Sequence, residues 1–332
     1  INGSTQRITA LGLEKGSKLL KKGNLLLLVR GSMLWKRIPI CYNNIDVAFN
    51  QDVKGIMAKN KDVTPYFLLY WFCSQQNRLL YRVTGTGIGA GKLDTSELLA
   101  LPLYLPSKEE MNKIGNCLKL LDERIATQHK IIDKLQSLIK GLPYKMAADG
   151  IANGEWTKVP LSKVLVERKE LNTNLYTVHS VSVSEGVINQ IEYLGRSFAA
   201  KDTSNYHVVK YGDVIYTKSP TGDFPYGIVK QSFIQGRVAV SPLYGVYSPI
   251  SVEIGTFLHY YFMSAILTTN YLYPLIQKGA KNTINISNQR FLENYIPFPI
   301  DMNKVYNIVR TLMSIQFKLD IEKYIAKRLS QQ

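Results

Sequence analysis

The sequence predicts an α+β protein in which two pseudo-repeated mixed domains are separated by two long helices that form an antiparallel coiled coil. Three observations predict this architecture. Short apolar runs that follow Gly-Asn or Gly-Asp turns indicate strands, the same order of motifs occurs twice about 190 residues apart, and a heptad pattern follows each copy. The 332 residues suit two domains, and 45% hydrophobic residues allow both to bury a core.

The internal repeat covers about 110 residues in each copy. A turn starts it, at Gly23 in the first copy and at Gly212 in the second. Two apolar strands follow, and then an aromatic helix over residues 67–72 in the first copy and 257–262 in the second. A polar loop and a short proline-containing strand close each copy. Each copy is therefore predicted to be a compact unit of strands and helices.

The first copy is predicted to be incomplete at its N-terminal end. Trp156 lies 56 residues before Gly212 in the second copy, whereas 22 residues precede Gly23. We therefore expect four segments: an incomplete first domain over 1–105, a central helical spacer over 106–150, a second domain over 151–299, and a C-terminal helical spacer over 300–332.

After each copy, apolar residues recur with the alternating three- and four-residue spacing of a heptad seam. Ser107 with Glu110 three residues later indicates where the first helix begins, and Gly141 and Pro143 predict its end. The two seams lie 194 residues apart, and they contain Ile114, Leu118, Leu121, Ile125 and Gln128 in the first helix and Ile308, Leu312, Ile315, Leu319 and Glu322 in the second.

One polar residue occupies the same step of both seams, Gln128 in the first and Glu322 in the second. A polar seam residue can fix the register of a helix pair at a cost in stability. Alternatively, the second helix shifts its apolar face at this point and uses Ile321 and Ile325 instead. Both interpretations place the two helices against each other.

The charge balance indicates a polyanionic partner. The chain has 41 Lys and Arg against 25 Asp and Glu, a formal charge of +16, and basic side chains neutralise phosphates with release of counterions. A basic solubility surface is the alternative. Cys41, Cys73 and Cys117 show no zinc-ligand spacing, which is typical of reduced thiols in a cytoplasmic protein. No apolar run approaches the 18 residues of a membrane span.

No motif predicts chemistry within the chain. The glycine-rich segment from Gly85 to Lys92 resembles a phosphate loop, but Thr86 occupies the position where a Walker loop needs glycine. An adenine-methylation motif, a metal-ligand cluster and a nuclease carboxylate cluster are also lacking. The sequence therefore predicts no catalytic residue, no metal site and no cofactor site.

Two loops in each copy are candidates for contacts with DNA, because Lys and Arg pair with phosphates or guanine edges and Asn can read adenine. One loop follows the strand after the glycine turn, and the other follows the aromatic helix. Ordinary solvated loops are the alternative. The candidate residues are Arg30, Ser32, Lys36, Arg37 and Lys92 in the first copy and Lys218, Ser219, Thr221, Tyr226, Lys278, Lys281, Asn282 and Asn285 in the second.

With these features the chain resembles the specificity subunit of type I restriction–modification systems over essentially its whole length. The order of unit, helix, unit and helix matches, and the passage 101–110 is similar to the start of that family's conserved helices. An ordered set in the second copy resembles its target-recognition domains, at 180–187, 200–206, 212–216 and 240–244. The sequence departs from the family in its short first copy. It also departs at residues 298–301, where the second helix begins without an acidic pair like Glu109-Glu110 of the first.

The resemblance implies a non-catalytic subunit whose two target-recognition domains each read one half of a bipartite site in double-stranded DNA. It adds Ser180 and Ser182 to the candidate contacts. It also implies two methyltransferase partners that use S-adenosylmethionine, restriction subunits that can join them, and a location in the cytoplasm of a prokaryote. Two other functions stay open: a fragment of a fused methyltransferase or nuclease whose catalytic part lies elsewhere, and a coiled-coil adaptor that binds DNA without reading its sequence.

Overall fold

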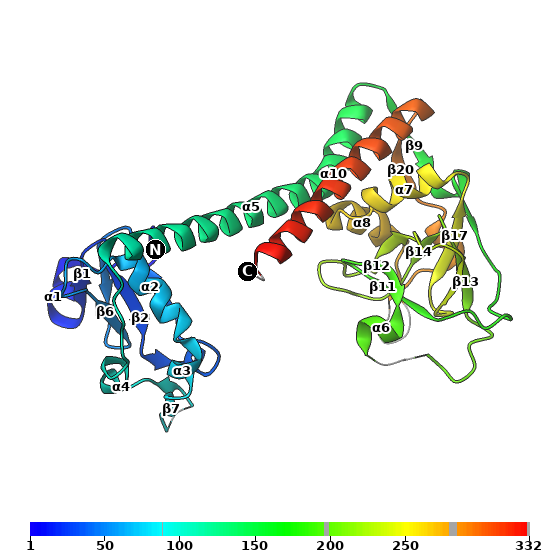
Figure 1. The fold of residues 1–332 in the computed structure, drawn as a ribbon. Helices are drawn as coiled ribbons and strands as arrows, with labels where there is room; N and C mark the ends of the chain where they lie inside the picture. The colour runs from blue at the N-terminus through cyan, green and yellow to red at the C-terminus, as the bar shows by residue number, and fades with distance from the viewer. Residues whose placement is uncertain (88, 196–198, 279–283, 331–332) are drawn as a thin grey trace. The chain divides into compact units, whose positions relative to one another are not determined.

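The computed structural model describes residues 1–87, 89–195, 199–278 and 284–330 (Figure 1). The chain divides into two compact units, unit 1 over Ile1–Thr127 and unit 2 over Gln128–Gln332. The division falls inside the longest helix, α5 (Lys108–Ala152). The first half of α5 therefore belongs to unit 1 and the second half to unit 2.

Unit 1 is built around strand β2 (Leu25–Leu28), whose leucines are mostly buried. Antiparallel strands lie on both sides of it in the order β4-β2-β6, and helix α2 (Pro65–Ser74) packs phenylalanines against the same core. The predicted strand and the predicted aromatic helix are both confirmed. The other elements are α1 (Ala10–Gly16), β1 (Lys18–Leu20), β3 (Arg30–Gly31), η1 (Ser32–Trp35), β4 (Ile40–Tyr42), β5 (Val47–Phe49), β6 (Val53–Ile56), α3 (Gln76–Leu80), β7 (Thr84–Gly85), β8 (Gly91–Lys92) and α4 (Thr95–Leu99).

Unit 2 is built around strand β14 (Val214–Tyr216), which is completely buried in a sheet of order β10-β17-β14-β15. Helix α7 (Val252–Tyr261) covers this sheet with aromatic side chains. The other elements before the last helix are β9 (Trp156–Pro160), η2 (Leu161–Lys163), β10 (Leu165–Glu167), β11 (His179–Ser182), β12 (Gly186–Asn189), α6 (Gln190–Leu194), β13 (His207–Lys210), β15 (Val229–Gln231), β16 (Arg237–Val240), β17 (Gly245–Pro249), α8 (Ala265–Leu272), η3 (Tyr273–Leu275), β18 (Gln277–Lys278), β19 (Ile284–Asn285), α9 (Asn288–Phe291) and β20 (Tyr295–Pro299).

The strand order confirms that the two units are copies of one design. In unit 1 the order is β4-β2-β6 with a separate pair β1-β5, and in unit 2 the corresponding strands have the order β15-β14-β17 with a separate pair β13-β16. Each unit then continues with two consecutive helices, α2 and α3 or α7 and α8. Elements β9 to β12 and α6 precede this shared part in unit 2, and helix α1 precedes it in unit 1.

Helix α5 begins where the sequence predicts. The Ser107 hydroxyl accepts a hydrogen bond from the Glu110 amide at 3.3 Å, and the Glu110 carboxylate accepts one from the Ser107 amide at 3.0 Å. This reciprocal pair satisfies two amides that the first turn would leave without partners. The Ser107 hydroxyl also donates to the Glu110 carboxylate at 2.8 Å, and this bond, together with the bond from the Ser107 amide, lowers the pKa of the Glu110 carboxyl below its usual value.

The predicted end of this helix at Gly141 and Pro143 is wrong, because α5 continues through Pro143 to Ala152. Proline removes one helical hydrogen bond and tends to kink or end a helix. Here the apolar stripe carries on past it: Ile139 and Ala147 are buried in the core of unit 2, and Pro143 is buried as well. Burial of this continuous stripe outweighs the lost hydrogen bond.

The last helix, α10 (Met302–Leu329), runs antiparallel to the second half of α5 within unit 2 (Figure 1). Its N-terminus is capped by Asp301, whose carboxylate accepts from the Asn303 amide at 2.8 Å. Its inward residues share one core with Leu135 and Ile139 of α5 and with α7. The chain therefore forms the predicted two mixed domains and long helices, with an antiparallel helix pair inside unit 2.

Candidate nucleic-acid interface

In unit 1 the structure brings together all the predicted contact residues that lie before α4. Strands β3, β8 and β7 form a small antiparallel sheet in which Arg30 is paired with Lys92. Lys36 and Arg37 follow the turn η1 directly and are exposed, as is Ser32 within it. We call Arg30, Ser32, Lys36, Arg37 and Lys92 the first basic surface. Strand β7 of this sheet lies at the end of unit 1 away from α5 (Figure 1).

The glycine-rich segment forms a hairpin that is fixed against the turn η1. Gly91 allows this close approach, because a Cβ there would lie 2.9 Å from Leu34 and from Val83. On the other side the Trp35 indole donates a hydrogen bond to the Gly89 carbonyl at 3.0 Å. Trp35 keeps 52% of its surface exposed. An exposed indole among basic side chains offers a stacking surface for bases, and its place in the run Trp35-Lys36-Arg37 was the sequence signal that we missed.

In unit 2 the corresponding loop connects β14 to β15. It carries Lys218, Ser219, Thr221 and Tyr226, and a tight turn within it is closed by two backbone hydrogen bonds of 3.0 Å between Thr221 and Phe224. Lys218 is half-buried and has a positive φ of 60°, which is unusual for a residue other than glycine. Its burial lowers the pKa of its ammonium group.

The conformation at Lys218 depends on a close approach by Gly227. A Cβ at Gly227 would lie 2.9 Å from the backbone nitrogen of Lys218, and its own φ is +98°. The backbone carbonyl of Tyr226, which precedes Gly227, accepts a hydrogen bond of 2.7 Å from the buried Tyr216 hydroxyl. The loop is therefore held by the strand beneath it.

An aromatic contact joins this loop to the segment that follows the second pair of helices. The rings of Tyr226 and Tyr273 lie 5.9 Å apart, and Tyr273 begins the turn η3 that leads into strand β18. Lys278 in β18 and Asn285 in β19 are placed by their backbones in one hairpin, where Lys278 pairs with Ile284. Lys281 and Asn282 lie outside the described residues. We call Lys218, Ser219, Thr221 and Tyr226 the second basic surface.

Ser180 and Ser182 lie on β11, in a hairpin with β12 that is separate from the loop between β14 and β15. The Ser180 hydroxyl accepts a hydrogen bond from the Gln190 side chain at 3.1 Å, and Ser182 lies 3.3 Å from the Ser184 hydroxyl. Both serines are half-buried. The structure thus gives these two residues local hydrogen bonds that stabilise the hairpin.

Comparison with known families decides which kind of domain carries the first basic surface. Residues 2–137 match the family described as the type I restriction modification DNA specificity domain. Unit 1 is a type I DNA specificity domain. The matched region contains Arg30, Ser32, Lys36, Arg37 and Lys92. The family is defined by DNA specificity, not by catalysis, which agrees with the lack of catalytic motifs in the sequence.

Solved structures extend the likeness from the specificity domain to the whole chain. The fold is similar to that of the S subunit of a type I restriction–modification system from M. genitalium, with a TM-score of 0.61 and 15% identity over 94% of this chain and 81% of that chain. The HsdS subunit from Thermoanaerobacter tengcongensis gives a TM-score of 0.44 and 15% identity, over 96% and 80% of the two chains. A chain from a study of complex assembly and conformational transition of the type I R-M system gives 0.48 and 15%, over 96% and 81%.

Unit 2 therefore repeats the topology of the specificity domain.

None of the apolar seam residues predicted on α5 before Gln128 is fully buried. Leu118 and Ile125 are half-buried, while Ile114 and Leu121 remain exposed. In unit 2 the seam residues Ile308, Leu312 and Leu319 are buried and Ile315 is half-buried. Of the two residues of the alternative seam, Ile321 is exposed and Ile325 is half-buried.

The two polar residues of the seam, Gln128 and Glu322, contact each other directly. The Gln128 amide donates to the Glu322 carbonyl at 3.2 Å and also to the Glu322 carboxylate. Gln128 is buried and Glu322 is half-buried. The two residues that the sequence places at equivalent steps therefore meet.

Two buried basic groups lie in the sheet and helix below the second basic surface. Lys230 on β15 is 4% exposed, and burial together with the neighbouring charge of Lys140 lowers the pKa of its ammonium group to about 8. His259 on α7 accepts a hydrogen bond from the Gln231 amide at 3.1 Å through Nδ1. Burial lowers the pKa of this imidazole to about 3, so it is neutral at physiological pH. Both groups lie within unit 2, and no local pattern of the sequence indicated their burial.

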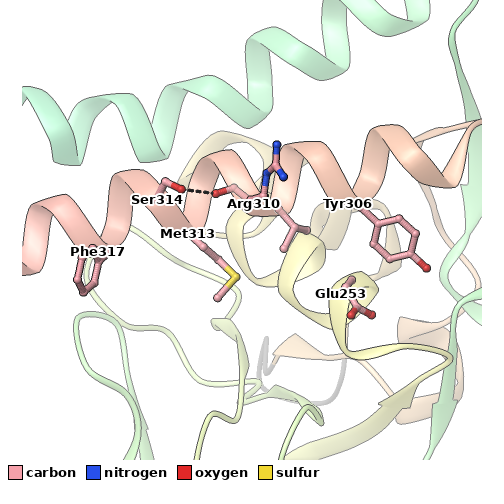
Figure 2. A pocket seen from close by; sticks show the side chains of 7 residues that line it. Glu253, Tyr306, Arg310, Met313, Ser314 and Phe317 are labelled. Carbon is pink, nitrogen blue, oxygen red and sulfur yellow. Dashed lines mark hydrogen bonds between the residues drawn. The ribbon is translucent and has the colours of Figure 1, made fainter.

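A separate apolar groove of about 550 Å³ lies on unit 2 beside α10 (Figure 2). Figure 2 shows Tyr306, Met313 and Phe317 on one side of this helix, and Glu253 of α7 across from Tyr306. The groove contains no residue of either basic surface. Over the described residues, no group of three His, Cys, Asp or Glu could hold a metal ion, and no helix is long and apolar enough to cross a membrane.

Proposed function

We propose that this chain is the DNA specificity subunit of a type I restriction–modification complex, and that it reads a bipartite double-stranded site through its two basic surfaces. One recurring arrangement supports this proposal. In each unit, an aromatic side chain joins the loop after the central strand to the segment that follows the helices. The contact is Trp35 to Gly89 of the hairpin in unit 1, and Tyr226 to Tyr273 of the turn η3 in unit 2.

Each basic surface combines two classes of contact. Lys and Arg side chains such as Lys92 and Arg37 neutralise phosphates or bind guanine edges, and polar side chains such as Ser32 and Thr221 accept or donate to bases. The formal charge of +16 supplies the sequence-independent attraction. Two copies of one domain allow two different half-sites to be read, because their loop sequences differ while their sheets agree.

The catalytic chemistry belongs to partners in this proposal. Two methyltransferase subunits, which bring S-adenosylmethionine, dock on the long helices, and restriction subunits can join the complex. The complex acts in the cytoplasm of a prokaryotic cell. The likeness of the fold to an S subunit at a TM-score of 0.61 supports the assignment of this role.

Selection of bound DNA from a random-sequence pool, with the methyltransferase partner present, tests the proposal. We expect an enriched motif with two short conserved halves separated by unspecified bases, and binding that weakens steeply with salt. An enriched pool without any motif would instead favour an architectural adaptor. Methyl transfer by the chain in the absence of a partner would favour a fused methyltransferase.

A further inference from the structure

An exposed tyrosine follows the second of the two consecutive helices in each unit. Tyr81 comes directly after Leu80, the last residue of α3, and Tyr273 comes directly after Leu272, the last residue of α8. Tyr81 is 93% exposed and Tyr273 is 64% exposed. Neither residue belongs to the basic surface of its unit.

The agreement between the two units at this position has no explanation in packing. Leu80 and Leu272 pack against the cores of their units, so a leucine is required at both places. The tyrosines that follow face solvent, and the next residues differ, Arg82 in unit 1 and Pro274 in unit 2. A shared aromatic residue at an exposed position between different loops indicates a common contact outside the unit.

Both hydroxyls are available to a ligand. The Tyr81 and Tyr273 hydroxyls make no hydrogen bond to any part of the chain that the structure describes. The hydroxyls of the buried Tyr216, Tyr247 and Tyr271, in contrast, each donate to a backbone carbonyl. A free tyrosine hydroxyl can donate to a phosphate oxygen while its ring packs on the neighbouring sugar.

In unit 2 the exposed tyrosine lies at the edge of the second basic surface. The ring of Tyr273 is 5.9 Å from that of Tyr226 and is tilted by 43°. The turn η3 is held in place by the buried Leu275, whose carbonyl accepts a hydrogen bond of 3.2 Å from the Arg290 side chain. Pro274 restricts the backbone of the turn further. Tyr273 is therefore presented by a rigid turn beside the loop between β14 and β15.

In unit 1 the exposed tyrosine is tied to the small sheet that carries Arg30 and Lys92. Val83 packs so closely on strand β8 that a Cβ at Gly91 would lie 2.9 Å from it. Strand β7 follows at once, and its first residue, Thr84, pairs with Lys92. Tyr81 is three residues before Thr84, so at most about 11 Å separates their Cα atoms. Tyr81 therefore lies beside the first basic surface.

The two tyrosines suit the sugar–phosphate backbone better than the edges of the bases. A tyrosine offers one hydroxyl, whereas the side chains that distinguish base pairs offer two groups, as Arg does to guanine and Asn to adenine. The same residue type also occurs in both units, although the two units are proposed to read different half-sites. Backbone contacts carry no sequence information, so one residue type serves both halves of a site.

We infer that Tyr81 and Tyr273 bind the DNA backbone, where each donates its hydroxyl to a phosphate oxygen beside the half-site that its unit reads. These contacts fix the register of each unit on the duplex. The inference rests on the proposed function. It adds a class of contact that differs from the basic side chains, because a neutral hydroxyl releases no counterion when it binds a phosphate.

Replacement of each tyrosine by phenylalanine tests the inference, with the full chain in complex with the methyltransferase partner and a duplex that carries the selected motif. Tyr81→Phe and Tyr273→Phe should each weaken binding about tenfold. The slope of log affinity against log salt and the enriched motif should stay as in wild type. Tyr104→Phe and Tyr295→Phe are matched controls, because both tyrosines are exposed but lie outside the turns after α3 and α8. The controls should bind like wild type.

Duplexes with single neutral methylphosphonates locate each contact. In one half of the site, a substitution that weakens wild type should not weaken Tyr81→Phe any further, and a position in the other half should behave in this way for Tyr273→Phe. Wild-type affinity in both variants overturns the inference and leaves the proposed function standing. An altered motif or a smaller salt slope in either variant also overturns it. A wild-type complex that enriches no motif overturns both.

Discussion

Gln128 and Glu322 lie at the same step of the two repeated helices, 194 residues apart, and they are hydrogen-bonded to each other across the helix pair. Residues related by a twofold axis meet their own counterparts only on that axis. The contact therefore marks a local pseudo-twofold axis between the second half of α5 and α10. This geometry is what a duplicated unit with a heptad seam requires for antiparallel pairing.

A buried polar pair at this step is expected to set the register at some cost in stability, which is our first prediction. Gln128→Leu should destabilise the chain by about 1–3 kcal/mol, because the Glu322 carboxylate loses its buried partner. Replacement of both residues by leucine should recover that loss or exceed it. Thermal unfolding measures both effects. A double variant no more stable than Gln128→Leu would show that the buried pair is not the cause.

Register can be measured in the same variants by cross-linking. Leu135 and Ile315 line one pocket between the helices, so cysteines at these positions should form a disulfide in a chain whose own cysteines are replaced by serine. With Gln128 and Glu322 present, we expect a disulfide only between cysteines at positions 135 and 315. In the double leucine variant, we also expect disulfides when one cysteine is placed one heptad away from its position.

Lys92 is predicted to contact phosphate without reading sequence. Lys92→Ala should weaken binding to all DNA sequences by a similar factor and lower the slope of log affinity against log salt by about 1. Lys15→Ala on α1 removes the same charge outside the basic surface and should change the slope little. A change in sequence preference in Lys92→Ala would instead identify this residue as a reader of bases.

Gly227 is predicted to hold the second basic surface in shape. Gly227→Ala places a Cβ against the backbone of Lys218 and strains a positive φ, so the loop must shift. We expect loss of the preference for one half-site while the other half-site is still read. Gly222→Ala is the control, since Gly222 also has a positive φ but open space around it. Equal effects of the two substitutions would contradict the role of the close approach.

Lys230 is predicted to make unit 2 more stable at alkaline pH. Its folded pKa of about 8 lies below the unfolded value of 10.5, so the folded state releases its proton first. Stability should therefore rise between pH 8 and 10, by up to about 3 kcal/mol. Lys230→Met removes the charge and should be more stable than wild type at pH 7, with a difference that shrinks as the pH rises. A constant difference across this range would argue against a buried charged lysine.

The sequence predicted the repeat, the strands beside each glycine turn and the start of α5, because each follows from local patterns of apolar residues and caps. The end of α5 could not be predicted from Pro143, because burial of the stripe from Ile139 to Ala147 decides it, and that burial depends on tertiary packing. For the same reason the polar step at Gln128 could be located but its partner could not be established.

The candidate sites were predictable in kind but not in arrangement. The basic loops could be found from their residue types, whereas the pairing of Arg30 with Lys92 arises from short strands of two residues that carry no periodic signal. The exposure of Trp35 and the positive φ of Lys218 also depend on the folded hairpins. Ser180 and Ser182 were implied by family resemblance alone, and here they make local hydrogen bonds.

Selection of bound DNA with loop variants tests most directly whether each of the two domains reads one half of the site. In complex with the methyltransferase partner, the variant K36A/R37A should lose one half of the enriched motif and keep the other, and the variant S219A/T221A should show the reverse. Loss of complementary halves is the result that two independent reading domains predict. Loss of both halves in either variant, or an unchanged motif in both, would contradict it.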